Sequence, residues 1–254
     1  MEIRVLGCHG AQLPGYNTTS FLLDDKILID AGTVTSILTI EEQIEIDHIL
    51  VTHSHLDHVK DIAFLADNLH RQKKSPVDIV STQGIIDILR SNLFNGVVWP
   101  DFSMIPDVHN PVIRFRPIEP GRQYALNGVI ITAVMVHHVV ETVAYVVDFG
   151  AGSVIFVGDT GPTEDIWKIA NDRNDVNAIF IETSFPNDMI DVAEAAGHFT
   201  PASLNEELKK LSLESPHVYL YHLKPQYYDV IQREVGLIKR NNIRILNEGE
   251  IIHI

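Results

Sequence analysis

The segment His53-Ser54-His55-Leu56-Asp57-His58 brings three imidazoles and a carboxylate together within six residues. Burying that many polar side chains without partners costs several kcal/mol, so they cannot all be ordinary core residues. Imidazole nitrogens and carboxylate oxygens are the donors that Zn²⁺ prefers, and Mn²⁺ and Fe²⁺ also accept them. In an extended turn, His53 and His55 would point to one side and Asp57 and His58 to the other, which predicts two metal half-sites.

Three further donors stand where predicted strands end. His138 follows an apolar strand, Asp159 lies in the turn Gly158-Asp159-Thr160-Gly161, and His222 follows the apolar run at 217–221. Each of these residues alone is an ordinary surface or core residue in most proteins, but their shared placement at strand ends supports a common site. His137 competes with His138 for the same role. A solvated histidine-rich loop, the alternative interpretation of the first segment, leaves these later donors unexplained.

The elements that must position these donors follow from periodicity. The first half predicts strands at 1–6, 18–23, 26–30, 48–52 and 77–80, helices at 34–43, after His58 and at 83–94, and a long loop at 95–111. The second half predicts strands at 129–136, 142–149, 153–157, 178–182, 217–221, 243–246 and 251–254, and helices after Pro162, near Pro201 and at 226–240. Two such halves predict two sheets packed face to face with helices outside, in one domain over 1–254.

Composition limits the partners. The chain has 254 residues, of which 45% are hydrophobic, and a net charge of −15, which disfavours nucleic acid because no clustered basic face is available. No apolar run approaches the roughly 20 residues that a membrane span needs, and the N-terminus carries no secretion-signal pattern. The single cysteine, Cys8, fits a reducing compartment, so a cytoplasmic location is expected. A homodimer is expected only because that assembly is common.

The motif HxHxDH, the later histidine, the Gly-Asp turn and the final strand-end histidine resemble those of the metallo-β-lactamase superfamily. The resemblance implies a four-layer αββα sandwich of two mixed sheets. It also implies two divalent ions, one held by His53, His55 and His138 and the other by Asp57, His58 and His222, with Asp159 between them. His138 is preferred over His137 because the family's ligand precedes a tyrosine by seven residues, here Tyr145. Asp30, in Leu28-Ile29-Asp30-Ala31-Gly32, matches the family's first motif as a residue that orients ligands.

Several segments are similar to those of class II cyclic nucleotide phosphodiesterases within that superfamily. They include Glu182-Thr183-Ser184-Phe185, Gly197-His198-Phe199-Thr200-Pro201 and His222-Leu223-Lys224-Pro225, and with VWPDF at 98–102 and the metal motifs they span nearly the whole chain. One departure is Asp61, which stands where that family usually has glycine. The resemblance implies hydrolysis of cyclic AMP or cyclic GMP to the 5′-monophosphate by a water or hydroxide shared between the two ions.

Other residues acquire expected roles from this chemistry. Asp57 would also orient the attacking water, His198 would protonate the leaving 3′ oxygen or contact the phosphate, and Glu182 would orient His198. The alternatives are a place for His198 in the N-cap region before the helix start at Thr200-Pro201, and simple surface exposure for Glu182. Asn17, Thr18 and Thr19 are candidates for substrate contact, although turn chemistry also explains them. Trp99 and Phe102 could stack a base, but packing within their own loop is the preferred interpretation.

Three competing functions remain at this level. A tRNA 3′-processing endonuclease shares the metal motifs but calls for a basic surface. A hydrolase of lactams, lactones or thioesters would attack carbon and has no need of His198. A binding module with structural metals is the interpretation without catalysis, and it fits poorly because structural zinc sites are closed and single.

Overall fold

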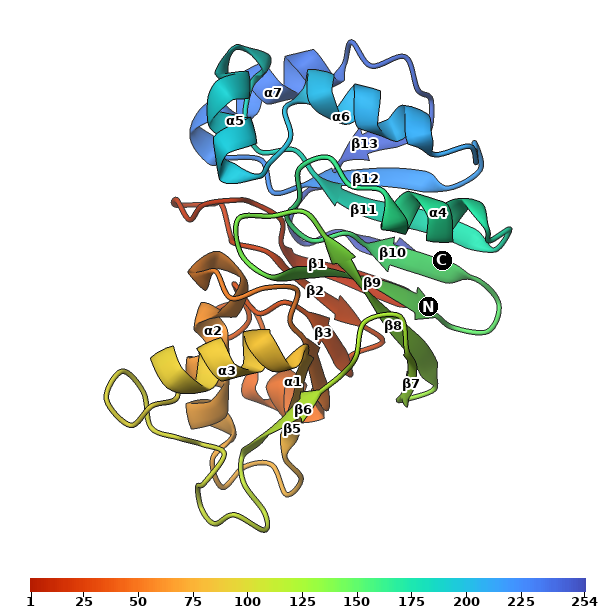
Figure 1. Cartoon of the computed structure of the whole chain (residues 1–254). Helices are drawn as coiled ribbons and strands as arrows, with labels where there is room; N and C mark the ends of the chain where they lie inside the picture. The colour runs from red at the N-terminus through yellow and green to blue at the C-terminus, as the bar shows by residue number, and fades with distance from the viewer.

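The first of two seven-stranded sheets has the order β14-β1-β2-β3-β4-β5-β6 in the computed structural model, which describes residues 1–254. Neighbours from β14 to β3 are antiparallel, and those from β3 to β6 are parallel. The strands are β1 (Glu2–Gly7), β2 (Ser20–Leu23), β3 (Ile27–Ile29), β4 (His48–Leu50), β5 (Val77–Ser81), β6 (Ile113–Pro117) and β14 (Ile251–His253). Because β14 pairs with β1, the two chain ends lie side by side (Figure 1).

The second sheet repeats this pattern, in the order β13-β12-β11-β10-β9-β8-β7. Neighbours from β7 to β10 are antiparallel, and those from β10 to β13 are parallel. The strands are β7 (Gln123–Leu126), β8 (Val129–Val136), β9 (Thr142–Asp148), β10 (Ser153–Phe156), β11 (Val176–Glu182), β12 (His217–Tyr221) and β13 (Ile243–Ile245). Both sheets are therefore mixed, as the resemblance implied.

Helices cover the outer faces of both sheets (Figure 1). On the first sheet lie α1 (Ile40–Glu45), α2 (Leu56–Leu69) and α3 (Gln83–Asn92). On the second lie α4 (Asp165–Asn171), α5 (Ile190–Ala196), α6 (Pro201–Glu207) and α7 (Tyr228–Val235), with short 3₁₀ turns η1 (Asn187–Met189), η2 (Leu208–Lys210) and η3 (Pro225–Tyr227). The result is the expected αββα sandwich. No helix is both long and apolar enough to cross a membrane.

Two apolar clusters hold these layers together. The larger, of 47 buried residues, fills the space between the sheets and under α2 and α3. Phe21 of β2 meets Phe156 and Phe180 of the second sheet there, with ring centroids 5.4 Å apart in both pairs. The smaller, of 20 buried residues, lies between the second sheet and α4, α6 and α7. The strand ends that carry polar residues are thus fixed by cores on both sides.

The predicted helix at 34–43 was wrong in its position. Helix α1 begins only at Ile40, because Thr39 and Glu42 form a capping box, and the backbone of Val34 and Thr35 instead donates to the Asp61 carboxylate. The helix predicted at 226–240 is shorter, since α7 ends before Gly236. Strands β6 and β7 and helix α5 had no predicted counterpart. The remaining elements lie within a few residues of their expected bounds.

Candidate metal centre

The predicted donors meet at one edge of the sandwich, where strands of both sheets end. His53 follows β4, His138 follows β8, Asp159 follows β10 and His222 directly follows β12. Strands β8, β10 and β12 run in the same direction, so their carboxyl ends share this edge. Open α/β sheets commonly bind ligands at the carboxyl ends of parallel strands.

The extended turn predicted for the HxHxDH segment was wrong. Helix α2 begins at Leu56 with His55 as its N-cap residue, so Asp57 and His58 lie in its first turn. A carboxylate is favoured there by the helix dipole. Helical geometry still separates the donors into two sets, since His53 and His55 precede the helix while Asp57 and His58 belong to it.

The first group of donors consists of His53, His55, His138 and Asp159, whose ligand atoms all lie within 4.8 Å of one another. His138 Nε2 is 3.4 Å from His55 Nδ1, and His53 Nε2 is 3.6 Å from Asp159 Oδ2. The structure therefore brings three imidazoles and one carboxylate, from both halves of the chain, around one point.

The second group consists of Asp57, His58 and His222, also within 4.8 Å. His222 Nε2 is 3.2 Å from both His58 Nε2 and Asp57 Oδ2. Asp159 Oδ2 lies 3.2 Å from His222 Nε2 and 3.4 Å from His58 Nε2, so this carboxylate borders both groups. Asp159 therefore borders both donor groups, and its role as a ligand shared by two ions stays a prediction.

Unpaired buried atoms support metal ions at these groups. His53 Nε2 and Asp159 Oδ1 are buried and have no hydrogen-bond partner, a state that is costly unless another ligand satisfies them. Burial lowers the pKa of His53 well below its usual value, which keeps the lone pair available. Burial opposes ionisation of Asp159, but the imidazoles of His222 and His58 outweigh it and lower that pKa strongly. The neutral His53 ring and the ionised Asp159 carboxylate are the forms that bind a divalent cation.

Asp30 and Thr52 orient the donors of the first sheet. His58 Nδ1 donates to Asp30 Oδ2 at 2.7 Å, and the Thr52 hydroxyl donates to the same oxygen at 2.8 Å while accepting from His53 Nδ1 at 3.0 Å. Asp30 has a left-handed backbone, with φ 56°. Such a strained, buried carboxylate fixes both rings with Nε2 toward the cluster. Asp30 was predicted for this role; Thr52 was missed, although it directly precedes His53.

Ser184 and Gly197 orient the donor imidazoles that follow strands of the second sheet. The Ser184 hydroxyl lies 2.9 Å from His222 Nδ1, and the Gly197 carbonyl accepts from His138 Nδ1 at 2.9 Å. Gly197 has φ 69°, and a Cβ there would stand 2.9 Å from His138 Nδ1, so glycine is required by both conformation and space. Neither residue was a predicted site residue, although both lie in segments that carry the resemblance.

His198 and Glu182 form a buried pair beside the cluster. His198 Nδ1 donates to Glu182 Oε1 at 2.7 Å, and Ser184 Oγ donates to Glu182 Oε2 at 2.9 Å. Glu182 is fully buried, so the alternative of simple exposure is excluded. Burial lowers the pKa of His198, but the Glu182 carboxylate outweighs it and raises the pKa above its usual value. His198 also groups with Asp159 and His222, with one ligand atom of each residue within 4.8 Å of the others, so its ring lies next to the metal donors.

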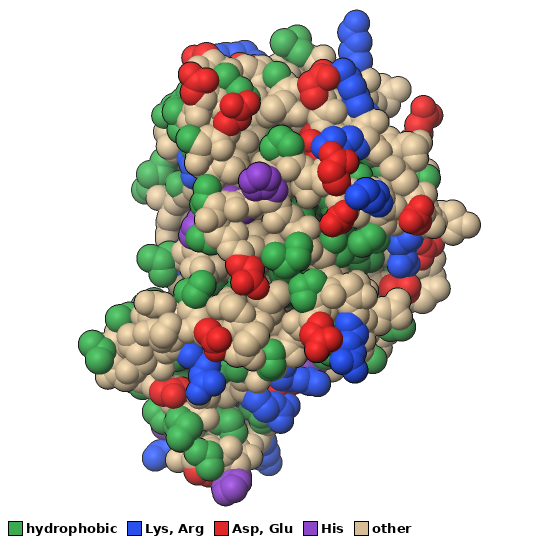
Figure 2. Space-filling view, viewed as in Figure 1, with side chains coloured by type: hydrophobic (Ala, Val, Ile, Leu, Met, Phe, Trp, Pro, Cys, Tyr) green, Lys and Arg blue, Asp and Glu red, His purple; other side chains and the backbone are tan.

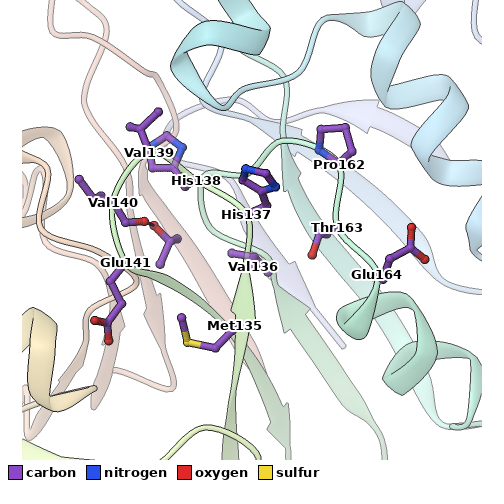
Figure 3. Close-up of a pocket in the computed structure, with 11 residues that line it drawn as sticks. Met135, Val136, His137, His138, Val139, Val140, Glu141, Pro162, Thr163 and Glu164 are labelled. Atoms are coloured by element: carbon purple, nitrogen blue, oxygen red, sulfur yellow. Dashed lines mark hydrogen bonds between the residues drawn. The ribbon is translucent and has the colours of Figure 1, made fainter.

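The loop after β8 carries His138 and borders a cavity of about 680 Å³ (Figure 3). The structure brings His138, and not the exposed His137, into the donor cluster. The Gly161 N–H donates to the His137 carbonyl at 2.7 Å. The His137 and His138 rings lie at different places along the loop (Figure 3). Glu141, at the other end of the loop, accepts from the hydroxyl of Thr82, the N-cap residue of α3.

The other predicted contacts lie outside the donor groups. The Asn17 side chain donates to Glu248 at 2.9 Å, the Thr18 hydroxyl pairs with Thr33, and Thr19 is buried. Phe102 is buried in the core, and Trp99 packs on Phe64 with centroids 5.3 Å apart. Both rings therefore pack outside their own loop, against α2 and the core, so the preferred interpretation was wrong. Asp61, the departure from the family pattern, holds the backbone of the loop that follows Asp30.

Comparison with protein families agrees with this geometry. The model of a family described as "Beta-lactamase superfamily domain" matches residues 25–223, most of the chain. This protein belongs to the β-lactamase superfamily. The matched range contains every donor of both groups.

Two curated relatives of this superfamily member carry phosphodiesterase names. A "Probable 3′,5′-cyclic-nucleotide phosphodiesterase" of Yersinia pestis is 26% identical over 205 residues, covering 72% of this chain and 58% of the relative. A "cAMP/cGMP-dependent 3′,5′-cAMP/cGMP phosphodiesterase A" of Dictyostelium discoideum is 26% identical over 235 residues, covering 72% and 51%. The chain therefore spans a little more than half the length of these relatives.

Solved structures share the fold of this superfamily member. Unliganded yeast PDE1 has a TM-score of 0.85 at 20% identity, with 100% of this chain and 99% of that chain covered. The metallo-β-lactamase fold protein YhfI of Bacillus subtilis has a TM-score of 0.77 at 18% identity, covering 99% and 98%. Human tRNase Z, short form, has a TM-score of 0.72 at 16% identity, covering 100% and 99%. Because these proteins carry different names on one fold, the fold alone does not select a reaction.

Proposed function

We propose that this chain is a two-metal phosphodiesterase that hydrolyses 3′,5′-cyclic nucleotides, cyclic AMP or cyclic GMP, to 5′-monophosphates. The observation that carries the proposal is the His198–Glu182 pair beside the metal donors, in which a buried carboxylate raises the pKa of the imidazole. Cleavage of a phosphodiester releases an alkoxide that needs a proton, and a positioned imidazolium supplies one. The names of both curated relatives support the same substrate class.

The metal ions would be held by the two donor groups, with Asp159 shared. Zn²⁺ fits this mixture of imidazole and carboxylate best, with Mn²⁺ or Fe²⁺ as alternatives. Bound ions would supply Lewis acidity and a water acidic enough to react near neutral pH. Side chains of this protein would orient the water and supply the proton.

Asp57 and His198 would act on opposite sides of the scissile bond. The Asp57 side chain is 28% exposed and so is open to the substrate. Burial opposes its ionisation, but the hydrogen bond from His222 outweighs it and lowers its pKa, so Asp57 is a carboxylate that can orient the attacking water. Water oxygen would bond to phosphorus and lose one proton to solvent while the P–O3′ bond breaks; His198 would give its ring proton to O3′ and then take one back from solvent. The product is the 5′-monophosphate.

A tRNA-processing function has less support. Lys and Arg side chains alternate with Asp and Glu over the face in Figure 2, and the net charge is −15. A chain that binds the phosphates of a folded RNA needs a continuous basic surface. Asn17 and Thr18 remain proposed substrate contacts, which requires Asn17 to exchange its bond to Glu248 for one to substrate.

Substrate choice can be tested with zinc-reconstituted protein offered bis(p-nitrophenyl) phosphate, cyclic AMP, cyclic GMP, nitrocefin and precursor tRNA. The proposal predicts turnover of the first three. Turnover of nitrocefin or precursor tRNA without any cyclic nucleotide would overturn it.

The role of His198 is tested by His198→Ala. Because His198 is assigned as proton donor, the variant should keep both zinc ions and lose about 10²-fold or more in kcat on cyclic AMP. Zinc content is measured beside kinetics. Loss of zinc would make His198 a ligand instead, and full activity would remove it from the mechanism.

A further inference from the structure

Lys224 is a half-buried cation at the edge of the donor cluster with no assigned role in the chemistry above. It lies two residues after His222, and no carboxylate lies within 4.0 Å of its ammonium group. The ammonium donates one hydrogen bond, to the Gly10 carbonyl at 2.8 Å. An ammonium carries three N–H donors, so two remain for another acceptor.

The surroundings of Lys224 connect it to the candidate proton donor. Its Nζ lies 5.4 Å from the centroid of the Phe185 ring, and that centroid lies 5.8 Å from the His198 ring centroid. The His198 ring in turn stacks on His222 at 5.4 Å. A continuous row of side chains therefore runs from the outer edge of the donor cluster to the metal donors, and it consists of Lys224, Phe185, His198 and His222. The charge of Lys224 also lowers the pKa of His198, a smaller effect than that of Glu182.

Gly10 fixes the position of this lysine. The Gly10 N–H donates to the Leu223 carbonyl at 3.1 Å, and a Cβ on Gly10 would stand 2.7 Å from His222 Nδ1. The loop after β1 therefore packs against His222, and the Gly10 carbonyl holds the Lys224 ammonium at the outer edge of the donor cluster. A lysine held this way loses less side-chain entropy when it binds a second acceptor.

We propose that the Lys224 ammonium binds a non-bridging oxygen of an anionic substrate and thereby selects phosphodiesters over neutral esters, lactones and lactams. This inference rests on the proposed function and names Lys224 as the side chain that recognises the negative charge of the substrate. Hydrogen bonds from a cation to an anion are stronger than those between neutral groups. A neutral acyl substrate offers Lys224 no such partner.

Inorganic phosphate is the probe that tests this role without turnover. Calorimetric titration of the zinc-loaded full chain is compared for the wild type, Lys224→Met and Lys224→Arg. The methionine variant should bind phosphate about tenfold more weakly or worse, and arginine should restore affinity to within about threefold. Lys168→Met, an equal charge change on exposed α4, is the control and should bind as the wild type does.

Two further readouts separate recognition from support of the loop. Zinc content should be unchanged in Lys224→Met, and KM for bis(p-nitrophenyl) phosphate should rise more than kcat falls. If phosphate affinity is unchanged while hydrogen exchange of residues 10–16 accelerates, Lys224 only fastens the loop and the inference is overturned. If the wild type cleaves no cyclic nucleotide but phosphate binding still depends on Lys224, the proposed function fails and this inference stands.

Discussion

The two halves of the molecule share one strand pattern but supply the site in opposite ways. Each sheet has antiparallel neighbours on one side and parallel neighbours on the other. The first half contributes His53, His55, Asp57 and His58 from one short segment at the start of α2. The second half contributes His138, Asp159, Glu182 and His222 from the ends of four different strands.

This difference shows what holds each set of donors. The donors of the first half are kept together by local geometry, because a helix turn sets the spacing of Asp57 and His58. The donors of the second half are kept together by sheet register, such as the pairing of Glu182 with Tyr221 across β11 and β12. We therefore expect the second half to be more sensitive to changes away from the cluster.

The largest expected effect tests whether both halves serve the same ion. His58→Ala and His222→Ala remove donors of one group from opposite halves, so each should lower zinc content and reduce kcat/KM by roughly 10³-fold, since Lewis-acid stabilisation is worth several kcal/mol. Metal analysis and kinetics on bis(p-nitrophenyl) phosphate measure both quantities. His137→Ala, an exposed histidine on the loop of His138, is the control and should behave as the wild type. If only one of the two variants loses zinc and activity, His58 and His222 do not hold the same ion.

Glu182→Gln is expected to have an intermediate effect, confined to the second half. Glu182 holds His198 and, through Ser184, His222, so kcat should fall about 10-fold to 100-fold with zinc retained. Because the carboxylate raises the pKa of His198, its loss should move the alkaline limb of the pH–rate profile to lower pH. Glu207→Gln, a buried glutamate bonded to Trp167, is the matched control and should leave the profile in place. An unshifted limb would contradict the assignment of His198.

Glu141→Gln should have the smallest effect and concerns a link between the halves. Glu141 belongs to the His138 loop, but its carboxylate rests on the first turn of α3, where a Cβ on Gly84 would stand 2.3 Å from Oε2. Loss of this contact should weaken zinc binding by only about twofold to threefold, as for other exposed charge contacts. Gly84→Ala should match it, because the added methyl displaces the same carboxylate. Unchanged zinc affinity in both variants would show that the loop needs no such support.

The same contrast explains what the sequence could predict. The donors of the HxHxDH segment could be predicted because they are adjacent in the sequence. Strand β12 was predicted with its observed bounds because its apolar run, fully buried after His217, stands out in the sequence. The helix at 34–43 was wrong because the capping box at Thr39 makes α1 begin only at Ile40. The extended turn at Asp57 was wrong because α2 already begins at Leu56. Ser184 and Gly197 were missed because their contacts with His222 and His138 arise only from tertiary packing.

The most direct test of the central claim is a zinc titration of metal-free protein, followed by the initial rate of cyclic AMP hydrolysis at each zinc-to-chain ratio. Both halves contribute to both donor groups, with Asp159 between them. We expect the rate to rise to a plateau at about two zinc ions per chain, as in other two-metal sites. A plateau at one ion, or no hydrolysis of cyclic AMP or cyclic GMP at any ratio, would contradict it.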